Sequence, residues 1–106
     1  MRMLMRVRVP VDTGNAAITD GTLPQVIESS LRDLNAEAAY FLPMDGVRTA
    51  LIVFDLANSS QLPVVAEPFF MRLNAQVDFM PVMNADDLRE GLSAMAATAT
   101  AGNGNR

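Results

Sequence analysis

The chain has 106 residues but no cysteine, histidine, tryptophan or lysine, so all eight of its basic residues are arginine. These absences exclude disulfide bonds, Cys/His metal sites, histidine general bases and lysine Schiff bases. Long apolar runs are also missing. The longest have five residues, as in 50–54, whereas a membrane span needs about 20. We therefore expect a soluble cytoplasmic protein that has no signal sequence and requires no metal or cofactor.

Charged residues are few as well, and acidic residues outnumber basic ones. Charged residues make up 19% of the chain, the net charge is −4 and the isoelectric point is about 4.5. A nucleic-acid surface needs clustered basic residues, so we expect no nucleic-acid partner. Arg2, Arg6 and Arg8 do cluster near the N-terminus, where they alternate with apolar residues. This alternation favours one face of a β-strand over a patch that binds polyanions.

Hydrophobic residues, in contrast, make up 50% of the chain, which is enough for one folded domain and too many for a disordered chain. The sequence also contains an internal repeat. When shifted by 39 positions, residues 23–40 match residues 62–79 at seven of 18 positions, where about one or two matches would be expected by chance. Both copies begin with Leu-Pro and contain Leu-Asn-Ala, which indicates a duplicated structural unit.

Each copy of the repeat predicts a helix followed by a strand. Apolar residues recur at spacings of three and four through the first part of each copy, as in an amphipathic helix. Thr22 and Ser60 are expected to cap the two helices shortly before each Leu-Pro pair. Asn35 and Asn74 are expected to end the helices in the left-handed conformation. The strand of the first copy is predicted at residues 37–42.

The rest of the chain supplies the other elements of one domain. We predict strands at 1–9 and 47–56, a hairpin turn at 44–46, a loop at 11–21 with a helical turn at 16–19, and a last helix that Asn84 caps. The order is β-α-β-β-α-β plus a C-terminal helix. This predicts an α+β fold of the split βαβ, or ferredoxin-like, type, with an antiparallel sheet of order 4-1-3-2. We expect one domain over 1–96 and a weakly structured tail over 97–106.

Helices of such a fold cover only one face of the sheet, which leaves the other face open. Alternation of side chains assigns to this open face Leu4, Arg6, Arg8, Glu37, Ala39, Phe41, Thr49, Leu51, Val53, Asp55, Asp78, Met80 and Val82. The apolar members are too many for a surface in water. We therefore expect a homodimer in which two copies pack their open faces together as a dimeric α/β barrel.

Three short segments carry a resemblance to a known family: Val-Pro-Val-Asp at 9–12, Ala-Glu-Pro-Phe-Phe at 66–70, and Val-Asp-Phe-Met-Pro-Val at 77–82. In these motifs, and in its elements over residues 3–92, the chain resembles the small bacterial dimeric α/β-barrel proteins grouped with muconolactone-isomerase-like domains. The resemblance implies a dimeric barrel. Members include proteins of unassigned function, cofactor-free isomerases and oxygenases, and proteins that bind small aromatic ligands in the barrel. No catalytic residue matches, and members that rely on histidine cannot be models.

The open face also holds most of the candidate catalytic and ligand-binding residues. Asp78, Asp55 and Glu37 are candidate catalytic carboxylates, because an apolar barrel raises the pKa of a carboxyl group and suits it to proton transfer. The candidate ligand-binding residues are Arg6, Arg8, Tyr40 and Thr49, with the arginines as anion clamps. Each has a structural alternative. Arg6 and Asp78, expected on neighbouring strands, are then an ion pair, and Tyr40, matched by Phe79 in the repeat, is then a core residue.

Two functional classes therefore stay open. One is a non-catalytic homodimeric module that assembles or binds a small apolar ligand. The other is a cofactor-free isomerase or oxygenase that acts on a small apolar or aromatic substrate. A closed cavity holding both a carboxylate and an arginine favours the enzyme, whereas charges that pair with each other favour the module.

Overall fold

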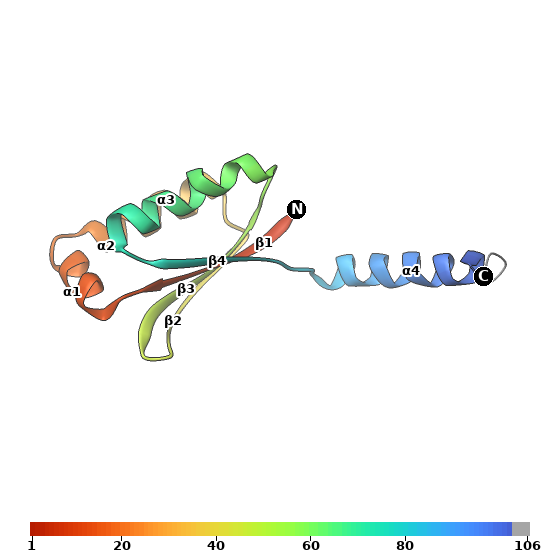
Figure 1. The fold of residues 1–106 in the computed structure, drawn as a ribbon, viewed down its shortest axis with the longest axis horizontal. Coiled ribbons are helices and arrows are strands. Elements are labelled where there is room, and N and C mark those ends of the chain that lie inside the picture. The colour runs from red at the N-terminus through yellow and green to blue at the C-terminus, as the bar shows by residue number, and fades with distance from the viewer. Residues whose placement is uncertain (103–106) are drawn as a thin grey trace.

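The computed structural model of the chain describes residues 1–102 and is an α+β structure built on one antiparallel sheet (Figure 1). In chain order its elements are β1 (Arg2–Val9), α1 (Val11–Thr19), α2 (Thr22–Leu34), β2 (Ala38–Met44), β3 (Val47–Asp55), the 3-10 turn η1 (Ser59–Gln61), α3 (Leu62–Leu73), β4 (Gln76–Pro81) and α4 (Ala85–Gly102). Helix α2 and strand β2 form the first repeat copy, and α3 and β4 form the second.

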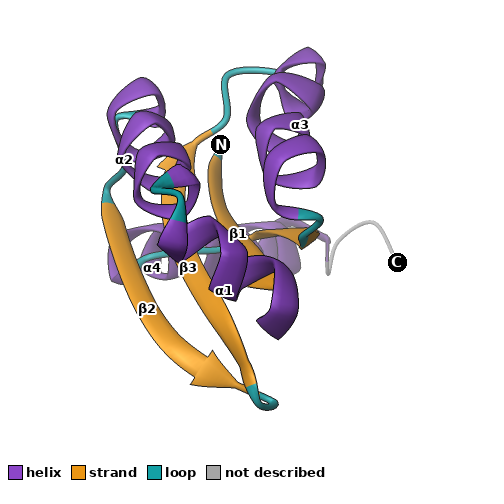
Figure 2. Ribbon diagram, turned by 90° about the vertical axis from the view of Figure 1, so that its left-hand side faces the viewer, coloured by secondary structure: helices purple, strands orange, loops and turns teal. Residues whose placement is uncertain are grey.

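The sheet has the strand order β2-β3-β1-β4, which is 4-1-3-2 when it is counted from the β4 edge. All of these neighbours pair antiparallel. The strands that end the two repeat copies therefore lie at opposite edges, with β1 and β3 between them. Helices α2 and α3 lie side by side over one face of the sheet (Figures 1 and 2). α4 projects beyond the sheet (Figure 1).

The core lies between the sheet and these helices, because every second residue of β1 and β3 is apolar and faces the helices. The buried apolar residues of the two strands are Met3, Met5, Val7, Val9, Ala50, Ile52 and Phe54, and the helices add Ala17, Val26, Val65, Ala66, Phe69 and Leu73. On β1 the residues between the buried ones are only half-buried and point to the other face. The predicted alternation of β1 and β3 is thus confirmed.

The two repeat helices end as predicted. Asn35 has φ 48° and ψ 55°, and Asn74 has φ 50° and ψ 34°, so both lie in the left-handed region. The hairpin turn is also left-handed at both central residues, Asp45 and Gly46. Two positive φ angles in a two-residue turn match the twist of the strands that they join.

The loop predicted after β1 is wrong, because residues Val11–Thr19 form helix α1. Gly14 suggested a turn, but it is buried inside the helix. A Cβ added to Gly14 would lie 2.6 Å from Nη1 of Arg48. A side chain at this position would require the flexible end of Arg48 to shift, so the glycine permits the observed approach of Arg48 to α1. The fold therefore contains one helix more than the predicted order.

Neither predicted cap is the N-cap of its helix, which is Gly21 for α2 and Gln61 for α3. Before α2, the backbone N–H of Thr22 donates to Oδ1 of Asp20 at 2.8 Å. Before α3, the backbone N–H of Ser60 donates to Oδ1 of Asn58 at 3.0 Å. The acceptor thus lies two residues before the expected cap in both copies, which is the Asx-turn pattern of Asp and Asn side chains. Thr22 and Ser60 donate where they were expected to accept.

Strand β2 departs from the repeat at its first residues. Glu37 donates its backbone N–H to the carbonyl of Val53 at 2.8 Å, and Ala38 is also the register partner of Val53. Two residues facing one is the arrangement of a β-bulge, and it moves all later side chains to the opposite face. Ala39 and Phe41 therefore face the helices, and their predicted place on the open face is wrong.

Helix α4 begins as predicted, with Asn84 as its cap. Asp87 donates its backbone N–H to Oδ1 of Asn84 at 2.8 Å, and Asn84 donates its own to Oδ2 of Asp87 at 3.1 Å. The helix continues to Gly102 and so includes residues 97–102 of the predicted tail; residues 103–106 of that tail lie outside the described residues. With α4 extended, the molecule measures 64 × 28 × 21 Å. Within residues 1–102, no helix combines the length and hydropathy of a membrane span.

Candidate functional site

The open face of the sheet, which no helix of residues 1–102 covers, carries most of the predicted site residues. The register of β1 with its two neighbours places Arg6 between Leu51 and Asp78, and Leu4 between Val53 and Met80. β2 adds Ala38, Tyr40 and Leu42 in place of the residues predicted there. The centre of this face is thus apolar, and charged groups lie among the apolar side chains.

Arg6 and Asp78 form the ion pair that was expected across β1 and β4. Nη2 of Arg6 lies 2.8 Å from Oδ2 of Asp78, and Nε donates to the same oxygen at 3.2 Å. The two side chains are 33% and 47% exposed. Because both charges are partly solvated and compensate each other, this arrangement stabilises two strands more than it activates a proton donor.

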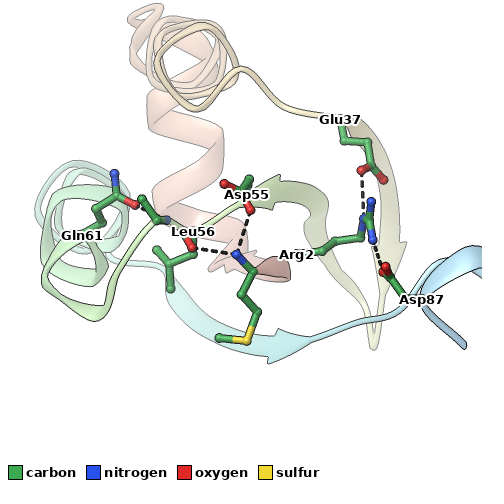
Figure 3. Close-up of polar contacts among 8 residues, drawn as sticks. Arg2, Glu37, Asp55, Leu56, Gln61 and Asp87 are labelled. Carbon is green, nitrogen blue, oxygen red and sulfur yellow. Dashed lines mark hydrogen bonds and ion pairs between the residues drawn. The ribbon is translucent and has the colours of Figure 1, made fainter. Parts of the chain in front are cut away.

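The other two candidate carboxylates, Glu37 and Asp55, each pair with a cation of their own (Figure 3). Glu37 accepts from Nε of Arg2 at 2.9 Å, and Arg2 also bonds to Asp87 at the start of α4. The hydrogen bond to Glu37 raises the pKa of Arg2, so this guanidinium stays charged. Asp55 lies 2.8 Å from the amino group of Met1. The three candidate carboxylates therefore pair with three different cations within the chain.

The remaining predicted ligand-binding residues, Tyr40, Thr49 and Arg8, differ in how far they are buried. Tyr40 is 67% exposed on the open face, so its interpretation as a core residue is wrong. Thr49 is 4% exposed, and its hydroxyl donates to the carbonyl of Val47 at 3.1 Å. Arg8 lies 3.6 Å from Asp45 through Nη1, and its buried Nε has no hydrogen-bond partner within residues 1–102. Arg8 thus has a buried donor atom without a partner among the described residues.

A cavity that the sequence did not reveal lies on the other face, between the sheet and the helices. Its volume is about 430 Å³, and apolar side chains from the strands and from α2 and α3 line it, among them Val7, Ile27, Phe41 and Phe69. Among the described residues that line it, Arg48 alone is charged. One signal for it was present in the sequence: alternation places Arg48 on the same face as Ala50, Ile52 and Phe54.

The charged groups on the two faces of the sheet therefore have different surroundings. On the open face, carboxylates and arginines neutralise each other, whereas under the helices an arginine faces an apolar cavity without a lining carboxylate. The first arrangement suits assembly, and the second suits a ligand that brings its own negative charge. Searches of the sequence against protein-family models and against curated proteins found no match.

Proposed function

We propose that the chain is a non-catalytic homodimeric module that assembles through the open face of its sheet. One observation carries this proposal: in the described part of the chain no helix covers the sheet face whose centre is formed by Leu4, Leu51, Val53 and Met80. A second copy related by a two-fold axis presents the same apolar surface, so both are buried at once. The β-α-β-β-α-β arrangement of β1, α2, β2, β3, α3 and β4 supports a ferredoxin-like fold and, for the pair, a dimeric α/β barrel.

The charges of the open face are compatible with burial between two sheets. A charge that loses water must be paired, and Arg6 and Asp78 already form a pair within one chain. Tyr40 places an exposed aromatic ring beside this surface, a residue type that is enriched in interfaces. The buried Nε of Arg8 offers a hydrogen bond that an acceptor of the second copy can complete.

Helix α4 supplies a second surface for the same partner. Leu88, Leu92 and Met95 form an apolar stripe and are 46%, 49% and 63% exposed. The radius of gyration is 18.1 Å, whereas a compact chain of this length has about 13 Å. An isolated helix is marginal in water. We therefore propose that α4 packs its stripe against the second copy.

The catalytic alternative, a cofactor-free isomerase or oxygenase, has less support. Such an enzyme needs a carboxylate whose pKa an apolar cavity raises. The candidates Asp78 and Glu37 instead bond to Arg6 and Arg2, and the residues that line the described cavity include no carboxylate. These pairings favour the module.

Sedimentation of the full chain at micromolar concentration and neutral pH tests the proposal. The wild type is expected to be a dimer whose interface exceeds about 1,000 Å² in total. Leu51→Asp places a charge at the centre of the open face and should yield a monomer. Met71→Asp is the matched control, because Met71 is 81% exposed on α3 and the variant should stay dimeric. A monomeric wild type, or a dimeric Leu51→Asp variant with native circular dichroism, contradicts the proposal.

The role of α4 and of the ion pair is tested in the same way. Leu92→Asp should raise the dimer dissociation constant, and Glu90→Gln on the same helix should not. Arg6→Leu leaves Asp78 unpaired in the interface and should weaken the dimer more than Arg6→Leu combined with Asp78→Leu. If Leu92→Asp has no effect, α4 does not contact the second copy. If the single Arg6 variant dimerises as well as the double variant, the pair is not buried there.

A further inference from the structure

The cavity under the helices has the size and lining of a small-molecule site. Its volume of about 430 Å³ falls in the range of about 300–1,000 Å³ that is usual for ligand pockets. Its lining comes from both layers of the fold, for example Val7 of β1, Ile27 of α2 and Phe69 of α3. It lies on the face opposite to the proposed dimer surface, so occupancy of this cavity does not depend on assembly.

Arg48 gives this apolar cavity one polar feature. Its guanidinium donates to neutral acceptors only, to Oδ1 of Asn15 at 3.0 Å and to the carbonyl of Val11 at 3.4 Å. Within residues 1–102 it forms no ion pair with a carboxylate, unlike Arg2 and Arg6. Guanidinium groups have five N–H donors, so Arg48 keeps donors and a full positive charge for an anion.

The fold holds Arg48 in place through helix α1. Both acceptors of its hydrogen bonds belong to α1, and the absence of a side chain on Gly14 leaves room for Nη1, which would lie 2.6 Å from an added Cβ. The guanidinium is therefore fixed at the cavity before any ligand arrives. Fixed donors lose less entropy on binding than mobile donors do.

Phe41 marks the mouth of the cavity. It lies on the edge strand β2, is 53% exposed, and lines both the cavity and a shallower hollow formed with Ile18 and Pro24. An aromatic ring that is half in water at the edge of an apolar space is suited to contact a flat apolar ligand. The bulge at the start of β2 turns Phe41 to this side of the sheet.

We infer that this cavity binds a small apolar monocarboxylate, with the aromatic or aliphatic body in the cavity and the carboxylate on the guanidinium of Arg48. Arginine and carboxylate match in geometry and form charge-assisted hydrogen bonds. The apolar body of the ligand replaces water in the cavity. The lining side chains are apolar except for Arg48 and Thr49. The hydroxyl of Thr49 is already bonded to its own strand, so Arg48 determines the orientation of the ligand.

Calorimetric titration of the full chain with naphthoate and with its uncharged analogue naphthamide tests this site. The wild type should bind naphthoate about tenfold or more tightly than naphthamide, because only the acid pairs with Arg48. Arg48→Met should remove this preference, and Ile27→Trp, which fills the cavity, should weaken both compounds. Arg32→Gln is the matched control, since Arg32 is 73% exposed and its Nε lies 3.8 Å from Oδ1 of Asp33, and this variant should bind as the wild type does. Equal affinity of both compounds for the wild type overturns the inference, as does absence of binding at millimolar concentration.

Two further measurements keep the test decisive. If Arg48→Met fails to fold, backbone amide shifts of the wild type replace it: naphthoate should shift Gly14, Phe41 and Arg48 and should leave Tyr40 unchanged. Shifts confined to the open face would overturn the site. Leu51→Asp, designed to be monomeric, should bind naphthoate as the wild type does. A failure of dimerisation and a failure of ligand binding are thus distinguishable.

Discussion

The two copies of the repeat have similar sequences and matching helix ends, yet they direct their strands differently. Tyr40 and Phe79 occupy the same position of the repeat. Phe79 packs against the core, edge-on to Phe54 with ring centroids 6.3 Å apart, whereas Tyr40 is 67% exposed on the other face. The difference lies in the strand pairing, because Glu37 and Ala38 both face Val53 of β3. The two copies align without a gap, so the bulge against β3, and not an inserted residue, decides which side of β2 faces the core.

The largest expected difference between the two copies comes from substitutions at Phe79 and Tyr40. Phe79→Ala removes a partly buried ring that packs against the core and should lower the free energy of unfolding by about 2–3 kcal/mol. Tyr40→Ala removes a ring from an exposed site and should change it by less than about 0.5 kcal/mol. Urea denaturation of both variants at several protein concentrations measures the difference. Equal losses that do not vary with concentration would show that both rings are core residues. A Tyr40→Ala loss that varies with concentration would report dimerisation.

The helix ends allow a second test, with a smaller effect, in which the two copies should behave alike. Asn35→Val and Asn74→Val force a β-branched residue into the left-handed region, and each should cost about 1–2 kcal/mol. Asn35→Gly and Asn74→Gly are the controls and should be close to neutral, because glycine adopts this conformation freely. Thermal unfolding of the four variants measures these costs. A valine variant as stable as its glycine control would contradict the common helix end.

Sequence reasoning succeeded where a local pattern determines the structure. Spacing along one segment was enough to predict the alternation on β1 and the left-handed Asn35 and Asn74. Adjacency of two strands was enough to predict the Arg6–Asp78 pair. Sequence reasoning failed where a distant contact decides. Gly14 was assigned to a loop, whereas the structure places it inside helix α1, where Nη1 of Arg48 on β3 approaches it.

The same limit applies to the candidate site. The predicted carboxylates were placed on one face, and the structure gives Asp55 and Glu37 separate cations at the end of the sheet near Arg2. The bulge that moves Phe41 to the helix face is invisible in the repeat, because a bulge is defined by pairing with another strand. The cavity beside Arg48 depends on both features, so it emerged only from the structure.

The smallest expected effect concerns the starts of the two repeat helices, which differ by one functional group. Asp20 accepts the backbone N–H of Thr22, and Asn58 accepts that of Ser60 in the same geometry. Hydrogen bonds from Thr22 lower the pKa of Asp20, first through its side chain and then through its backbone. The folded state thus binds this proton less readily than the unfolded state, so the contribution is present above pH about 4 and is lost as pH falls through the lowered pKa.

The lowered pKa of Asp20 predicts that only the first copy responds to acid at the start of its helix. In a pH titration followed by NMR, the Thr22 amide should shift with a midpoint below about 3.9, the ordinary value for aspartate, while the Ser60 amide should not follow a local titration. Asp20→Asn keeps the acceptor oxygen and should abolish the Thr22 transition. Asn58→Asp should create one at Ser60. A Thr22 midpoint at or above the ordinary value would show that the carboxylate of Asp20 does not hold the start of α2, and the two copies would then differ in their strands alone.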